Sequence, residues 1–300
     1  GYGCQGNLEG NQPGANTAGS GGSGTTPSGN LTPEQVLASA ACAKPAPGAA
    51  PLRRLSNAEY RNTLQDLLAD VAGIGPAVDD ATKDFVQEAE SLGFRNNVDF
   101  LGVSSLIAQG YMDSAEVLAP LVAGTDKVVG CTTADAACAK QFVEAFGKRA
   151  FRRPLLPEEV ARYTAVYDKS AAKGYDFKTG IEWVVFSMLQ STQFLYRVEL
   201  GAQKGTDYAP SGYEIANRLS YLVWQSMPDQ SLFDAAEKGE LSTKQQIEAQ
   251  ARRMLKDPKA SRLLEYFDQW RDTDRRSALD RDANVYPGIV GNLPELLQNE

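Results

Sequence analysis

The chain has 300 residues, enough for one large domain or for two or three small ones, and 42% of them are hydrophobic. Its formal net charge of −8 disfavours a nucleic-acid partner, because the average field would repel a phosphate backbone. The sequence contains no histidine, which excludes from this chain a Ser-His-Asp or Cys-His site, His-ligated zinc and a haem attached at Cys-x-x-Cys-His. An Asp-x-Asp-x-Asp-Gly calcium loop is also missing. We therefore expect no cofactor and no metal in this chain.

The first 50 residues differ in composition from the rest. Residues 10–30 are rich in Gly, Ser, Thr, Pro and Asn, which cannot bury a core, so we expect residues 1–50 to be a disordered tether. Cys4 follows Gly3 directly before this tether, an arrangement that resembles the processing site of bacterial lipoproteins, although Gly1 stands where that pattern usually has Leu. The resemblance implies a lipid on Cys4 and a location in the bacterial cell envelope, at the outer membrane or in the periplasm. The alternative is a plain tail with a thiol.

The sequence has no run of 18 or more apolar residues, so we expect membrane contact only through the lipid anchor. The chain begins with Gly and ends at Glu300 inside text of helical character. We therefore expect it to be an N-terminal piece of a longer protein.

From residue 51 onward, apolar residues recur at helical spacing. Ser56 and Glu59 form a capping box that predicts a helix over 57–68, and Ser104 predicts the start of a second helix that runs to 121. Apolar stripes and start or stop residues predict further helices over 142–150, 157–173, 181–189, 213–225, 231–238, 244–256 and 260–270. Alternating strand patterns are almost absent. We expect an all-α fold, a multi-helix array of about eight to ten helices.

Three stretches of this helical text form recognisable motifs. The first reads LRRLS at 52–56, EYRNT at 59–63 and GFRNN at 93–97. The second reads FGKRAFRRPL at 146–155 and FLYRVE at 194–199, and the third reads ANRLSYLVW at 216–224 and QARRML at 250–255. Together they resemble the planctomycete-specific domains found in tandem in secreted, cytochrome-like bacterial proteins of unknown function, in planctomycetes and myxobacteria.

The resemblance implies helical modules over 51–130, 131–205 and 206–300, the last one truncated, and a secreted or envelope location. It implies no known reaction. The cytochrome label does not carry over, because the chain has no c-type haem motif and no histidine ligand.

Cys131 and Cys138 are separated by six residues, and in an exported protein such a pair is expected to form a disulfide. The alternative is a redox-active pair, which usually has the closer spacing Cys-x-x-Cys. Cys42 is then left over, and it either pairs outside this chain segment or stays a free thiol.

Five arginines stand close to predicted helix ends: Arg53, Arg54, Arg149, Arg152 and Arg153. Guanidinium groups bind oxyanions bidentately, so one hypothesis makes them an anion-binding clamp. The other makes them structural, with acid partners that join the modules, because an unpaired buried guanidinium would be costly. We expect the structural role, with an acid near Arg149, Arg152 or Arg153.

Other chemistry-bearing residues have plainer explanations. Glu158 and Glu159 lie in a predicted first helical turn, and Asp79 and Asp80 lie in a predicted loop, so we expect no glycosidase-like acid pair. The three tryptophans stand among apolar residues at helical spacing, so we expect them in the core: Trp183, Trp224 and Trp270.

These features predict a non-catalytic binding or assembly module of a lipid-anchored envelope protein, with an unknown envelope protein or ligand as its partner. The alternative is an extracellular enzyme or redox protein whose active site lies mainly beyond Glu300.

Overall fold

The computed structural model describes residues 51–204 and 207–271. The predicted tether, the lipid-attachment residue Cys4 and the unassigned Cys42 lie outside the described residues, as does the end of the third predicted module. The described residues from 52 onward belong to one compact unit.

The N-terminal helices begin where their capping residues predict. After strand β1 (Arg53–Arg54), helix α2 (Asn57–Leu67) starts with the predicted capping box, in which Ser56 Oγ accepts from Glu59 N at 3.1 Å and Glu59 Oε2 accepts from Ser56 N at 2.9 Å. Helix α3 (Ile74–Thr82) and the 3-10 turn η1 (Val98–Phe100) follow. Helix α4 (Ser105–Ala123) is capped by Ser104, as predicted.

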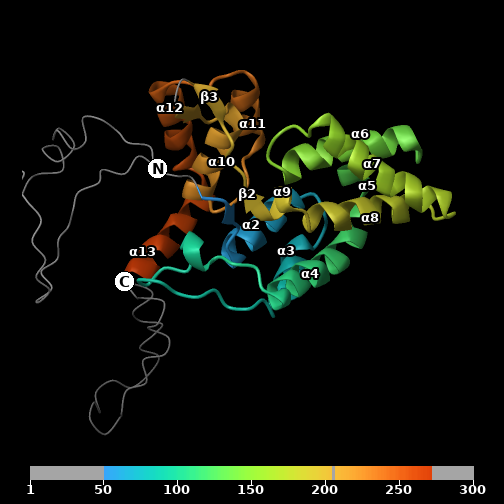
Figure 1. Ribbon diagram of the computed structural model, residues 1–300, viewed down its shortest axis with the longest axis horizontal. Helices are drawn as coiled ribbons and strands as arrows, with labels where there is room; N and C mark the ends of the chain where they lie inside the picture. The colour runs from blue at the N-terminus through green and yellow to red at the C-terminus, as the bar shows by residue number, and fades with distance from the viewer. Residues whose placement is uncertain (1–50, 205–206, 272–300) are drawn as a thin grey trace, which may run out of the picture. The chain divides into compact units, whose positions relative to one another are not determined.

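The middle of the chain is a set of helices packed around one central member. Helices α5 (Asp126–Val129), α6 (Ala136–Ala150), α7 (Pro157–Ala172), α8 (Phe177–Leu189) and α9 (Thr192–Leu195) follow in order. Helix α8 packs against both α4 and α7 (Figure 1). Its sequence is apolar on nearly all sides, and it buries Ile181, Val184, Val185, Met188 and Leu189, as expected of a helix with neighbours on several sides.

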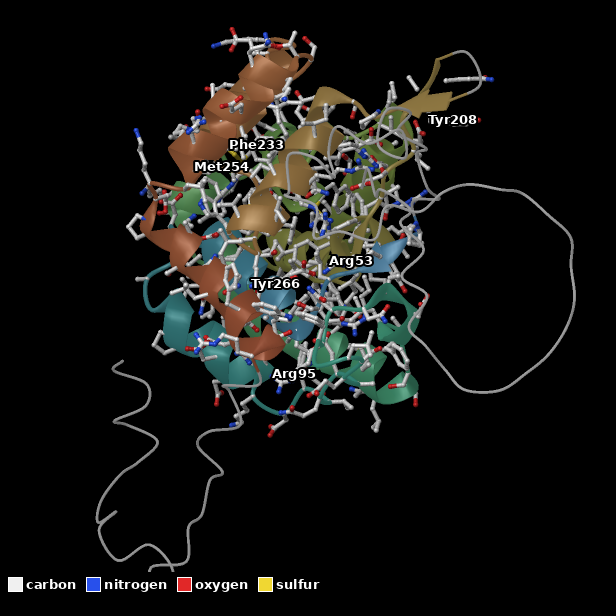
Figure 2. All side chains as sticks on the ribbon, turned by 90° about the vertical axis from the view of Figure 1, so that its left-hand side faces the viewer. Arg53, Arg95, Tyr208, Phe233, Met254 and Tyr266 are labelled. Atoms are coloured by element: carbon white, nitrogen blue, oxygen red, sulfur yellow. A yellow bond between two sulfur atoms is a disulfide. The ribbon has the colours of Figure 1, made fainter. Side chains whose placement is uncertain are left out.

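The chain forms two short antiparallel ladders. One joins segments that lie far apart in the sequence, and the other joins neighbouring segments. Strand β2 (Tyr196–Arg197) pairs with β1, and Leu55 N donates to Leu195 O at 2.8 Å beside that ladder. Strands β3 (Ala202–Lys204) and β4 (Asp207–Ala209) form a hairpin, on which Tyr208 is exposed at the edge of the molecule (Figure 2). The first ladder therefore ties the start of the described chain to the end of α9.

The C-terminal helices surround their own small core. They are α10 (Gly212–Val223), α11 (Gln230–Glu237), α12 (Lys244–Met254), the 3-10 turn η2 (Pro258–Leu263) and α13 (Leu264–Trp270). Trp224 is fully buried there with Leu232 and Met254, and its Nε1 donates to Met254 O at 3.1 Å. A larger core, with Tyr60, Phe142 and Phe194 among its members, lies mostly among α2 to α9 and also includes Tyr221, Met227 and Phe233.

The all-α prediction is confirmed, but several details differ. The described residues hold twelve α-helices instead of eight to ten, because the four-residue helices α5 and α9 are too short to give a periodic signal. Asp79 and Asp80 lie on α3, where Gly75 and Pro76 hide the helical pattern yet occupy the tolerant first turn. The side-chain cap of α12 is Thr243, directly before the helix predicted over 244–256.

The core prediction is correct for one tryptophan and wrong for two. Trp183 is 48% exposed and Trp270 is 66% exposed, whereas Trp224 is buried. Helical spacing among apolar neighbours does not distinguish the buried face of a helix from its edge, which explains the error.

Among the helices that the structure describes, none has the length and the apolar composition of a membrane span.

Candidate functional site

Arg54 lies at the centre of a buried polar cluster between α2 and α4. Its side chain is 1% exposed, and Nη2 lies 3.2 Å from Glu88 Oε1 while Nη1 donates to Tyr111 OH at 2.7 Å. Burial raises the pKa of Glu88, against the hydrogen bonds from Asn57 N and Arg54. Burial also raises the pKa of Tyr111 to about 12, so its hydroxyl stays protonated at neutral pH. The Arg54 guanidinium therefore makes all of these contacts inside the protein and is shielded from solvent.

Glu59 serves as the common acid of two arginines. Its Oε1 lies 3.1 Å from Arg53 Nη2 and 3.6 Å from Arg197 Nη1, while Oε2 caps α2. Arg197 also stacks over the Tyr221 ring, with 4.9 Å from its guanidinium carbon to the ring centroid. One carboxylate thus joins the start of α2 to β2 and, through Arg197, to α10.

Tyr221 on α10 is buried at the meeting point of three segments. Thr63 Oγ1 donates its one proton to Glu59 O at 2.6 Å, so the 2.7 Å contact between Thr63 Oγ1 and Tyr221 OH has the tyrosine as donor. Tyr221 OH in turn accepts from Arg152 Nη1 at 3.5 Å. A directed chain of hydrogen bonds therefore runs from Arg152 through Tyr221 and Thr63 to the backbone of α2.

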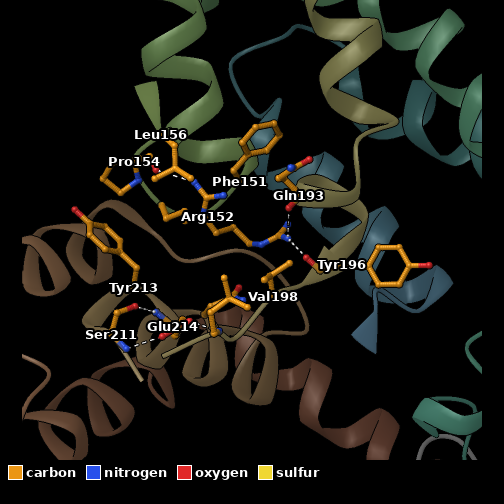
Figure 3. A pocket seen from close by; sticks show the side chains of 13 residues that line it. Phe151, Arg152, Pro154, Leu156, Gln193, Tyr196, Val198, Ser211, Tyr213 and Glu214 are labelled. Atoms are coloured by element: carbon orange, nitrogen blue, oxygen red, sulfur yellow. Dashed lines mark hydrogen bonds between the residues drawn. The ribbon is translucent and has the colours of Figure 1, made fainter. Parts of the chain in front are cut away.

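Arg152 holds the end of α9 with hydrogen bonds to carbonyl oxygens. Its side chain is 3% exposed, and Nη2 donates to the carbonyls of Gln193, Phe194 and Tyr196 at 3.0, 3.0 and 2.8 Å (Figure 3). Nη1 donates to Ala150 O at 3.3 Å. Its φ of 59° lies in the left-handed region, where a helix end usually has glycine.

Arg149 and Arg153 make different contacts from Arg152. Arg149 Nη2 donates to Asp66 O at 3.1 Å, which links α6 to α2. Arg153 forms a bidentate pair with Glu159, with both distances 2.8 Å. Burial would raise the pKa of Glu159, but the hydrogen bonds from Arg153 and Leu156 N and the charge of Arg153 lower it overall.

The structural hypothesis for the arginines therefore needs one correction. Arg53, Arg54 and Arg153 have acid partners. Arg152 has none within 4.0 Å among the described residues, and its charge is met by carbonyl oxygens and by the rings of Phe194 and Tyr221. The expectation that a buried guanidinium needs a carboxylate is wrong here. The last residues of a helix have carbonyl oxygens without partners in the helix, and the C-terminal end of α9 offers several of them to Arg152.

Asp66 on α2 is a second connection point between distant parts of the chain. Its carboxylate lies 3.0 Å from Lys259 Nζ and 3.5 Å from Arg262 Nη1, and it accepts from Ser226 Oγ at 2.6 Å. Three C-terminal residues thus converge on one residue of α2. No local pattern predicts this contact, because the partners are about 160 to 196 residues away along the chain.

A pocket of about 310 Å³ lies beside Arg152 (Figure 3). Its walls come from the chain after α6, the chain around β2 and the first turns of α10. Most of the wall is apolar, and the charged residues are Arg152, Arg153 and Glu214. The lining residues are Phe151, Arg152, Arg153, Pro154, Leu156, Gln193, Tyr196, Val198, Leu200, Ser211, Tyr213, Glu214 and Asn217.

Glu214 closes one side of this pocket as the capping residue of α10. Its carboxylate accepts from Leu200 N at 2.7 Å, Gly201 N at 3.0 Å and Ser211 N at 2.6 Å. Burial would raise the pKa of Glu214, but these backbone hydrogen bonds lower it below its ordinary value. The carboxylate is therefore occupied by the protein itself.

Two buried polar atoms of pocket-lining residues have no hydrogen-bond partner among the described residues. They are Nε of Arg152 and Oδ1 of Asn217, and Asn217 is only 5% exposed. Both atoms are shielded from solvent, so they lie behind the pocket surface and do not face its open space. Sequence reasoning did not single out Asn217, because an asparagine within a helical stripe gives no signal by itself.

The structure contains the predicted disulfide between Cys131 and Cys138, whose Cα atoms are 5.9 Å apart. Cys138 lies in the first turn of α6, where its N–H donates to the capping residue Asp135 at 2.8 Å. The bridge thus fixes the start of α6.

Within the ranges that the structure covers, no cluster of three His, Cys, Asp or Glu side chains could hold a metal ion.

These observations define a mainly helical protein whose described parts share buried polar junctions and line a pocket. Family comparisons divide the same residues into three stretches. Residues 53–124 match PSD3, a protein of unknown function (DUF1587), residues 138–199 match PSD5 (DUF1595), and residues 211–300 match PSD4 (DUF1592). The chain thus carries three tandem planctomycete-type domains, called here the first, second and third domain. No curated protein and no solved structure matches the chain.

Proposed function

We propose that this chain is a non-catalytic binding and assembly module of a lipid-anchored protein of the bacterial envelope. The observation that carries the proposal is the pocket between the second and third domains, with its mostly apolar walls and a few polar side chains. Small-molecule sites in proteins combine apolar walls with a few placed polar groups in this way. The pocket therefore has the composition of a binding site.

The domain junctions support the assembly part of the proposal. Tyr221 of the third domain contacts Thr63 of the first domain and Arg152 of the second, and Asp66 joins the first domain to Lys259 and Arg262. Such contacts hold the walls of the pocket at a fixed separation, which favours binding without a prior rearrangement.

An exported location is supported by two features of the chain. The Cys131–Cys138 disulfide fits an oxidising compartment. The Gly3-Cys4 sequence before a Gly/Ser-rich segment fits lipid attachment outside the cytoplasm.

The binding part is tested with a set of small neutral, anionic and cationic fragments, followed by ligand-observed NMR. We expect a subset to bind the wild-type chain and to lose binding in Leu200→Trp, which fills the pocket mouth. Leu222→Trp is the matched control, because Leu222 is an exposed leucine on α10 away from the pocket. If fragments bind all three proteins alike, the pocket is not the binding site.

The anchor is tested by metabolic labelling. A protein expressed with a lipoprotein signal in a Gram-negative host should incorporate labelled palmitate, and the Cys4→Ser variant should not. Equal labelling of the two proteins would rule out Cys4 as the lipid-attachment residue.

A further inference from the structure

Helix α13 carries apolar side chains that no described residue buries. Leu264, Phe267 and Trp270 recur every three residues, so they lie on one side of the helix, and all three are exposed. The helix has seven residues, and none of them is buried. Helices this short are marginal in water and gain stability by packing an apolar face against other residues. This side of the helix, called here the α13 face, therefore lacks a cover among the described residues.

The GFRNN motif of the first domain extends the α13 face. The Phe94 ring stacks on the Tyr266 ring with 5.1 Å between their centroids, and Tyr266 in turn meets the Phe267 ring edge-on at 5.5 Å. Arg95 N donates to Gln269 Oε1 at 3.3 Å, which places Arg95 beside α13 (Figure 2). The exposed apolar surface is thus shared by the first and third domains.

Leu92 presents a strained and exposed side chain in the same motif region. Ser91 and Phe94 exchange backbone hydrogen bonds of 2.9 and 3.0 Å, so Leu92 and Gly93 are the central residues of a tight turn. Both have a positive φ, 53° for Leu92 and 85° for Gly93, and Leu92 is 95% exposed. Leucine rarely adopts this backbone conformation. Strain that presents an apolar side chain to solvent indicates a contact beyond the described residues.

Residues 285–297 of the same chain have the composition and the reach to make this contact. Their sequence, VYPGIVGNLPELL, is mainly aliphatic and holds a single charged residue, Glu295. They belong to the third domain, whose family match covers residues 211–300. The intervening residues 272–284 can span up to about 45 Å, whereas α13 is about 10 Å long. An attached segment also has an effective concentration that favours it over a free partner.

We propose that residues 285–297 dock on the α13 face and on Leu92, and so join the third domain to the first through an apolar contact. Docking removes the exposed side chains of α13 from water, which stabilises this short helix. The same contact gives the strained turn at Leu92 a function. It is separate from the pocket beside Arg152, and it holds whether or not that pocket binds a ligand.

The test places the photo-crosslinking residue p-benzoylphenylalanine at Phe267 of the complete, disulfide-bonded chain, in an equal mixture of isotope-labelled and unlabelled protein. Trypsin cleaves after Arg271 and Arg281, so residues 263–271 and 282–300 become separate peptides. After irradiation we expect mass spectrometry to find these two peptides joined, with a single isotope composition in each pair. Pairs of mixed isotope composition would show that a second copy covers the face, and they would overturn the proposal.

Variants of the segment test its apolar side chains. Leu293→Asp/Leu296→Asp should abolish the crosslink, because burying an unpaired charge opposes docking. Asn292→Asp/Gln298→Glu adds the same charge at polar positions and should retain the crosslink. Unchanged far-UV circular dichroism verifies that both variants are folded. An undiminished crosslink in the leucine variant would overturn the proposal.

A second labelled position controls for unspecific reaction. Trp183 on α8 is an aromatic residue of the same exposure, 48% against 49% for Phe267. With p-benzoylphenylalanine in place of Trp183, no crosslink to residues 282–300 is expected. An equal crosslink from this position, or none from position 267, would show that residues 285–297 do not dock on the α13 face.

Discussion

Arg152 adopts a left-handed backbone conformation that costs a residue with a Cβ about 1 kcal/mol or more. A glycine at this helix end would avoid that cost. The Arg152 side chain must therefore stabilise the fold by more than the strained backbone destabilises it. The contribution is visible in its hydrogen bonds to the carbonyls of Gln193, Phe194 and Tyr196, all at the end of α9. This one residue fixes the geometry of the pocket wall.

The first prediction concerns the loss of this side chain. Arg152→Met should lower the free energy of unfolding by about 3 kcal/mol, because three carbonyls lose a buried donor. Arg153→Met should lower it by about 1 kcal/mol or less, since the Arg153 side chain is partly exposed. Urea denaturation followed by circular dichroism measures both. A loss for Arg152→Met no larger than that for Arg153→Met would contradict the structural role.

Arg152 and Arg153 show how much of the site could be predicted from the sequence. The FRRP motif places Arg152 and Arg153 at a helix corner, because Pro154 prevents the helix from continuing. Their partners were not predictable. Backbone carbonyls accept from any donor regardless of sequence, so the carbonyls of α9 carry no side-chain signal. Asn217 was missed for the related reason that an absent contact has no sequence pattern.

At the scale of elements, the disulfide closes a short loop before α6. In the chain-entropy model, an eight-residue loop contributes about 2.5 kcal/mol. The double variant Cys131→Ala/Cys138→Ala should lose up to this amount in urea denaturation, and reduced wild-type protein should behave like the variant. Unchanged stability in both would mean that the loop is already ordered without the bridge.

Glu214 determines how the α10 cap responds to acid. Its folded-state pKa lies below the ordinary 4.5, so the carboxylate stabilises the fold above pH 4.5, and that contribution is lost as the pH falls through the lowered pKa. The Glu214→Gln variant should be less stable than wild type at pH 7, and the difference should shrink below about pH 4.5. Urea midpoints across a pH series measure this effect. Glu240→Gln, at an exposed position, controls for the lost charge, and an unchanged difference down to pH 2.5 would contradict the prediction.

Elements with strong local signals were predictable, and those without them were not. Ser56 and Ser104 are side-chain caps, as the sequence predicts. Helix α3 was missed because Gly75 and Pro76 have low helix propensity, yet Ile74 and Val78 bury their side chains and stabilise the helix through tertiary packing. The two ladders were missed because strands of two or three residues give no alternating pattern.

The three domains share polar junctions and should unfold together. The Asp66 carboxylate of the first domain contacts Ser226, Lys259 and Arg262 of the third. Because these groups are partly buried, removal of the acid leaves two cations without their partner. The junction therefore couples the stability of the third domain to that of the first.

This coupling predicts a single transition for the wild-type chain. In a Trp183→Phe/Trp270→Phe background, which replaces only exposed tryptophans, buried Trp224 reports on the third domain alone. Its fluorescence midpoint in urea should coincide with that of far-UV circular dichroism. Asp66→Ala should move the fluorescence midpoint to lower urea than the dichroism midpoint. Separate midpoints without the Asp66 substitution would show that the domains are independent.

The β1–β2 ladder has a consequence for the order in which the chain can fold. Arg53 and Arg54 have Arg197 and Tyr196 as their backbone partners, and Leu55 N has Leu195 O. Synthesis and export both run from the N-terminus, so the first domain is present before its own first strand has a partner. That strand edge stays unpaired until the second domain follows. The two domains thus mature together, and a chain that ends before Tyr196 would present an incomplete first domain to chaperones and proteases.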